Sequence, residues 1–179
     1  MPDLPPRILR ASRLVAIAAT LALGAVPIAL AVYVFGFPEL LASHPAIGVL
    51  RLEPVALSPG VQLLCFVVLL ASAAPFLWAL WELRRLFRSY AGGQVFTAGA
   101  AHRLRRFAIA LMTSALARPF AGIGLSVALT LHRPPGARHL VAAIASDDFA
   151  IALVGGAVLV IAWVMGEAVR VAEDNASIV

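Results

Sequence analysis

Lysine is absent from this sequence of 179 residues, and the few charged residues that it has are mostly arginine. Charged residues make up 13% of the chain, about half of the ~25% that is usual in soluble proteins. Cys65 is the only cysteine and lies in an apolar run, which excludes an internal disulfide and a site built of several thiolates. Hydrophobic residues make up 62% of the chain. Because a small soluble domain leaves much of its surface in water, this composition predicts an integral membrane protein.

Four long apolar runs predict membrane-spanning helices at residues 14–37, 61–82, 107–131 and 149–171. The first run has 24 residues, so as a helix it is about 36 Å long and can cross a hydrocarbon core of about 30 Å. A secretory signal would have a shorter apolar core of about 7–15 residues. We expect residues 1–179 to form one domain, an all-α membrane protein folded as an antiparallel four-helix transmembrane bundle.

Two segments between the spans have patterns typical of short strands. Val49–Glu53 alternates apolar and polar residues, and His139–Ala145 could be a strand or the start of a helix. Both would lie on the outer face of the membrane, where pairing would satisfy one backbone edge of each. We therefore expect a small two-stranded extracytoplasmic cap.

The stretch 83–106, LRRLFRSYAGGQVFTAGAAHRLRR, is the long hydrophilic connection between the second and third spans. Glycine readily takes the conformation that ends a helix, and threonine is a good N-cap. The stretch therefore predicts a helical hairpin, with Val95 and Phe96 stapling the turn. The residues that we consider candidates for a functional site in this hairpin are Arg84, Arg85, Arg88, Gly92, Gly93, Phe96, Thr97, Arg103, Arg105 and Arg106.

The arginines predict the orientation of the chain in the membrane. With four spans, both termini and the 83–106 hairpin lie on the same side. That side carries ten arginines, the other side carries three, and Arg118 lies within a span, which together account for all fourteen. Because positively charged loops stay in the cytoplasm, we expect the termini and the hairpin to be cytoplasmic.

Arg118 is the strongest candidate for a functional residue within the membrane-spanning part of the chain. An arginine at the centre of a span costs about 2.5–3.5 kcal/mol on insertion scales, so such a residue usually faces a partner or a cavity. We expect an intramembrane charge pair between Arg118 and Glu167, because side chains on helices of opposite direction lean toward each other. A structural pair, a gate and an anionic ligand site all remain open.

The sequence offers little support for catalysis. No histidine has the spacing to a second ligand that a helical zinc site needs, so we expect no metal. Gly124–Leu125–Ser126 faintly resembles a serine-protease motif, but the spans contain no histidine that could act as its base. We expect no enzyme activity, no cofactor and no direct binding of nucleic acid.

The chain resembles a bacterial membrane-protein family, domain of unknown function 2975. The resemblance lies in the 83–106 stretch, in the segment RPPGARHL before the last span, and in the ending GGAVLVIAWVMGEAVRVAEDNASIV. It covers residues 14–179 and implies a four-span protein of the bacterial inner membrane. It also implies that some members are encoded beside small helix-turn-helix regulators.

These observations favour a non-enzymatic sensor or partner-binding protein that acts through its cytoplasmic arginine-rich hairpin. The expected partners are the lipid bilayer and, at the hairpin, anionic lipid or a cytoplasmic regulator. The small-residue pairs Gly122–Ser126 and Ala152–Gly156 suit close helix packing, within one chain or in a homo-oligomer. The alternative is a small transporter or export component that uses Arg118 as a substrate contact.

Overall fold

The computed structural model describes residues 5–42, 58–130, 140, 142 and 145–176, and the described part is helical. The elements are α1 (Pro6–Ala31), η1 (Val32–Gly36), α2 (Pro38–Ala42), α3 (Pro59–Ala91), α4 (Ala98–Thr130) and α5 (Ser146–Ala176). Here η1 is one turn of π-helix that continues α1.

Four helices are long and apolar enough to cross a membrane: α1 with η1, α3, α4 and α5. The predicted spans lie almost entirely within them. The helices extend further at the arginine-bearing ends, where α3 and α4 have 33 residues each and are therefore about 50 Å long. Both α1 and α3 begin with a proline. Proline suits this position because the N–H that it lacks would have no acceptor within the first helical turn.

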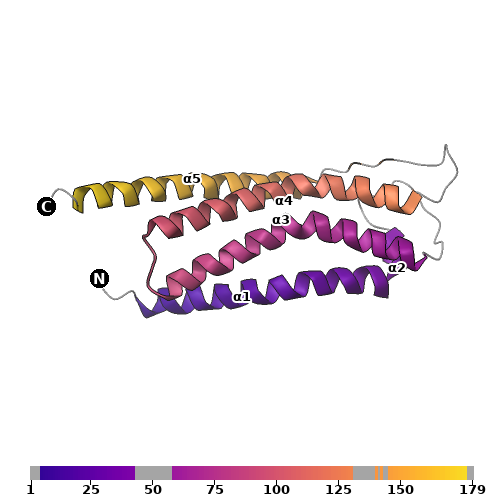
Figure 1. Cartoon of the computed structure of the whole chain (residues 1–179), viewed down its shortest axis with the longest axis horizontal. Helices are drawn as coiled ribbons and strands as arrows, with labels where there is room; N and C mark the ends of the chain where they lie inside the picture. Colours follow the sequence, from indigo (N-terminus) through magenta and orange to yellow (C-terminus); the bar gives the residue numbers. More distant parts are fainter. Residues whose placement is uncertain (1–4, 43–57, 131–139, 141, 143–144, 177–179) are drawn as a thin grey trace.

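The four long helices lie side by side in one row (Figure 1). The main contacts between them run from α1 to α3, from α3 to α4 and from α4 to α5. The prediction of an all-helical protein with four spanning-length helices is confirmed, but the helices form an open layer without a shared central core. The edge helices consequently expose many large apolar side chains, such as Leu14 and Leu21 on α1 and Leu153 and Val164 on α5.

Helix α4 lies close to both of its neighbours because one glycine stands at each contact. A Cβ added at Gly124 would lie 2.6 Å from Val68 Cγ1 on α3. A Cβ added at Gly155 of α5 would lie 2.6 Å from Met112 Cγ on α4. Both distances are too short for a side chain, so the two contacts require glycine.

Helix α5 is displaced along α4. Its third residue, Asp148, meets Arg118, whereas Gly166 lies opposite Ala101. The 12 residues of α4 after Arg118 therefore extend about 18 Å beyond the level of Asp148. The start of α1, the α3–α4 turn and the end of α5 lie at the same end of the layer (Figure 1).

The best-buried apolar cluster lies at the other end, where η1 and α2 fold against α3 and α4. Its members are Val34, Leu41, Val61, Cys65, Leu69, Leu125 and Ala128. Helix α2 lies between the first two predicted spans, where no helix is predicted. The Tyr33 hydroxyl donates to Leu40 O at 2.9 Å, which holds α2 against η1.

The predicted two-stranded cap finds no support, because the described residues contain no strand. Val49–Glu53 lies outside the described residues, as does most of His139–Ala145.

Candidate functional site

The turn of the 83–106 hairpin, hereafter the arginine hairpin, is held by backbone and side-chain caps. The N–H of Gln94 donates to Ser89 O and that of Gly93 to Tyr90 O, both at 3.0 Å. Gly93 has a φ of 85°, a conformation that suits glycine, and this bond pattern is the one by which helices commonly end. Thr97 caps α4 as predicted, since Ala100 N–H donates to Thr97 Oγ1 at 3.1 Å.

The base of the arginine hairpin is built on a buried acid. Glu82 is 1% exposed, and its Oε1 lies 3.2 Å from Arg106 Nη2 and 3.4 Å from Trp78 Nε1, which donates to it. The Arg106 guanidinium also stacks over the Trp78 ring, at 5.8 Å from its centroid. Arg84 stacks in the same way over Trp81, at 5.2 Å. The Arg106 contacts fix α3 against α4 where the apolar part of both helices ends, whereas the contact of Arg84 lies within α3.

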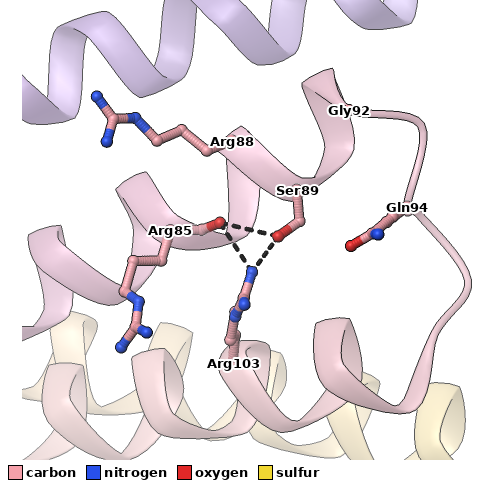
Figure 2. A pocket seen from close by; sticks show the side chains of 6 residues that line it. All are labelled: Arg85, Arg88, Ser89, Gly92, Gln94 and Arg103. Carbon is pink, nitrogen blue, oxygen red and sulfur yellow. Dashed lines mark hydrogen bonds between the residues drawn. The ribbon is translucent and has the colours of Figure 1, made fainter.

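Arg103 closes the arginine hairpin from the α4 side. Its Nη1 donates to Arg85 O at 3.2 Å and to the Ser89 hydroxyl, and Figure 2 shows the three groups meeting. Ser89 also donates to Arg85 O at 3.2 Å, so Arg103 ties the last turns of α3 to the first turns of α4. The role of Arg103 is therefore structural.

The other three arginines face solvent. Arg85, Arg88 and Arg105 are exposed and form no ion pair with an acid in the described part of the chain. Arg85 and Arg88 border a polar cavity of about 420 Å³ together with Ser89, Gly92, Gln94 and Arg103. In Figure 2 the guanidinium groups of Arg85 and Arg88 point away from each other. Of the six predicted arginines, Arg103 and Arg106 thus hold the hairpin together, Arg84 lies over a ring of its own helix, and the other three are available to a partner.

Phe96 does not staple the turn as predicted, because it is 81% exposed. The turn needs no staple, since the backbone bonds of Gly93 and Gln94 and the Thr97 cap already satisfy the polar groups at the two helix ends. The arginine hairpin consequently presents a large aromatic side chain among exposed arginines.

The predicted pair of Arg118 with Glu167 is corrected by the structure. Arg118 Nη1 lies 3.1 Å from Asp148 Oδ1, and Glu167 accepts from Arg170 Nε at 3.2 Å on its own helix. The displacement of α5 along α4 is the physical reason. It places the first turn of α5 beside the middle of α4 and carries Glu167 to the level of the arginine hairpin, opposite the region of Ala101.

Asp148 is the residue that the sequence interpretation missed. Its Oδ2 accepts the N–H of Ala145 at 3.0 Å, and Asp148 N–H donates back to Ala145 O at 3.0 Å. An acid at this position in a first helical turn is stabilised by the positive end of the helix dipole. The run Ser146–Asp148 is a recognisable helix start in the sequence. Its position at the level of Arg118 was not predictable, because that position depends on how α5 packs along α4.

Arg118 borders a second cavity, of about 380 Å³, between α3, α4 and α5. Its other lining residues are Leu69, Ser72, Ala73, Phe76, Ser114, Ala121 and Ile151. Ser72 donates to Ala117 O at 3.2 Å across the α3–α4 contact. Among the described residues there is no group of three or more metal-binding side chains, here or elsewhere.

The sequence model of the family described as "Protein of unknown function (DUF2975)" matches residues 10–179. No curated protein and no solved structure matches the chain.

Proposed function

The chain belongs to the DUF2975 family of proteins of unknown function, and we propose that it is a non-enzymatic protein of a bacterial inner membrane that senses or sequesters a cytoplasmic partner. The arginine hairpin is the binding surface in this proposal. The partner is a protein with an acidic surface, such as a regulator.

The proposed topology has four antiparallel spans and cytoplasmic termini. It is supported by the unequal distribution of arginine, with ten at the hairpin end, three in the connections at the other end and one within a span. It is also supported by the position of the start of α1, the α3–α4 turn and the end of α5 at one end of the layer. Trp78 and Trp81 lie at the level where tryptophan is enriched in membrane proteins, between the apolar part of α3 and its arginines.

The observation that carries the proposal is that the arginine hairpin exposes Phe96 as well as Arg85, Arg88 and Arg105. Exposed arginines are easily explained by topology alone, but an 81% exposed phenylalanine in the same hairpin is not. Aromatic residues and arginine are the residue types enriched at protein interfaces and at their hot spots. Because the guanidinium groups of Arg85 and Arg88 diverge, they suit several acids spread over a protein surface better than one small anion (Figure 2).

A pull-down from native membranes tests the proposal. Arg85→Gln with Arg88→Gln, and separately Phe96→Ser, should abolish capture of the partner. The matched control is Arg7→Gln with Arg10→Gln, which removes two exposed charges from the start of α1 at the same end of the protein. Equal capture by the hairpin variants and by the control would refute the proposal.

The alternative function, a transporter with Arg118 as its substrate contact, has less support. Asp148 already neutralises Arg118. Helix α4 also packs closely on α3 at Gly124 and on α5 at Gly155, on either side of the Arg118 level. These contacts favour a local pocket over a continuous path.

A further inference from the structure

Arg118 has more hydrogen-bond donors than the surrounding protein uses. A guanidinium carries five N–H groups, and the acceptor that the described residues place beside it is Asp148 Oδ1, at 3.1 Å from Nη1. This contact is ionic, because Asp148 Oδ1 forms no aligned hydrogen bond. The Arg118 side chain remains 50% exposed. The wall of the cavity beside Arg118 is mainly apolar and supplies few acceptors for the remaining donors.

The missing partner need not be negatively charged. Asp148 balances the charge of Arg118, and Asp148 itself is stabilised by Ala145 N–H and by the start of α5. An anion added beside this pair would leave a net negative charge in a mainly apolar cavity, which is costly. A neutral acceptor oxygen would satisfy the free N–H groups without that cost.

The cavity beside Arg118 has the composition of a small-molecule site. Its volume of about 380 Å³ lies in the range of about 300–1,000 Å³ that is typical of such sites. The wall is mainly apolar and includes Leu69, Phe76 and Ile151. The hydroxyls of Ser72 and Ser114 already donate to backbone carbonyls, at 3.2 and 2.7 Å. Among the polar groups that line the cavity, the guanidinium is therefore the one with donors to spare.

We propose that this cavity binds a neutral, lipid-soluble molecule with a carbonyl oxygen, which accepts hydrogen bonds from Arg118. Its apolar body lies against Leu69, Phe76 and Ile151. Molecules of this class, such as quinones with an alkyl tail, are dissolved in the bilayer and reach the cavity from there. The proposal concerns a site and a ligand separate from those of the arginine hairpin.

The test uses the whole protein in lipid nanodiscs, titrated with a decyl-substituted benzoquinone and, separately, with decanoate as an anionic probe. The quinone should bind to the wild type more tightly than decanoate does. Arg118→Lys keeps a positive charge for Asp148 but lacks the planar fork of donors. It should weaken quinone binding about tenfold or more, which is the effect of losing a hydrogen bond to a charged group.

Two alanine substitutions on α3 provide the steric control. Ala73→Leu fills the cavity and should abolish quinone binding, whereas Ala74→Leu, at an exposed position outside the cavity lining, should leave it unchanged. Asp148→Asn should retain the quinone and gain affinity for decanoate, because it removes the competing charge. Thermal unfolding of each variant shows whether it is folded.

Two results would overturn the proposal. One is quinone binding by folded Arg118→Lys or Ala73→Leu that equals wild-type binding. The other is a wild-type protein that prefers decanoate. Neither result would bear on the partner-binding role of the arginine hairpin, which the pull-down tests on its own.

Discussion

Helix α4 forms an ion pair with a buried acid at each of two levels, and the two pairs differ in what surrounds them. Glu82 and Asp148 are 1% and 7% exposed, and their partners Arg106 and Arg118 have similarly exposed side chains, at 42% and 50%. Arg106 stacks on Trp78 at the edge of the apolar region, whereas Arg118 borders a cavity within it. The comparison teaches that exposure alone does not identify a functional arginine, because the two arginines differ in what lies beside them: an aromatic ring in one case and a cavity in the other.

The largest effect on stability should come from removing Arg106. Arg106→Met leaves the carboxylate of Glu82 buried without its countercharge, which should lower the free energy of unfolding by about 3–5 kcal/mol. Denaturant titration in detergent micelles measures this. Combining Arg106→Met with Glu82→Gln should restore much of the loss. An Arg106→Met protein as stable as the wild type would show that the Arg106–Glu82 pair is not more important for stability than the Arg118–Asp148 pair.

Removing Arg118 should have a smaller effect, of about 1–3 kcal/mol, because Asp148 keeps its bond from Ala145 N–H. A double-mutant cycle sharpens the corrected pairing. Arg118→Met should couple with Asp148→Asn by more than about 0.5 kcal/mol and should be additive with Glu167→Leu. Coupling to Glu167 in place of Asp148 would contradict the position of α5 along α4.

A substitution in the turn of the arginine hairpin should lower the stability of the protein by still less. Gly93→Ala puts a side chain on a residue with a φ of 85° and should cost about 1–2 kcal/mol. Gly99→Ala is the matched control, because its added Cβ would meet only the Thr97 hydroxyl at 3.9 Å in the first turn of α4. It should be neutral or stabilising, since alanine favours helix more than glycine does. Equal losses at both positions would rule out the described turn.

The exposed arginines should contribute least to stability. Arg85→Gln with Arg88→Gln should change the free energy of unfolding by no more than about 0.5 kcal/mol, because neither side chain pairs with an acid in the described structure. The same double variant should lose the partner in the pull-down. A large loss of stability would instead assign these residues to the framework together with Arg103 and Arg106.

Local patterns in the sequence were sufficient to predict the helices and the turn of the arginine hairpin. Long apolar runs specify spanning helices whatever their neighbours are, and the end of α3 at Gly92–Gly93 and the cap at Thr97 depend on residues within one turn. The open row of helices was not predicted, because in lipid an apolar face is as stable against hydrocarbon as against another helix. Composition therefore does not distinguish a closed bundle from a layer.

The charge pairs were predicted less well, because they depend on how far one helix is displaced along another. The pairing of Arg118 with Glu167 assumed that the apolar parts of α4 and α5 lie at the same depth. The close contact of Gly155 with Met112 sets a different alignment, in which Asp148 reaches Arg118. Similarly, nothing local to Phe96 shows whether it packs on the turn or faces outward.

The orientation of the arginine hairpin is the claim on which the proposed function rests, and labelling of single cysteines tests it most directly. In a Cys65→Ala background, Phe96→Cys places a thiol at an exposed position of the hairpin, and Ser58→Cys places one at the exposed start of α3, at the opposite end. A membrane-impermeant maleimide added to intact spheroplasts should label position 58 and not position 96. Position 96 should react only after the membrane has been opened. Labelling of position 96 in intact spheroplasts would contradict a cytoplasmic hairpin and, with it, the proposed binding of a cytoplasmic partner.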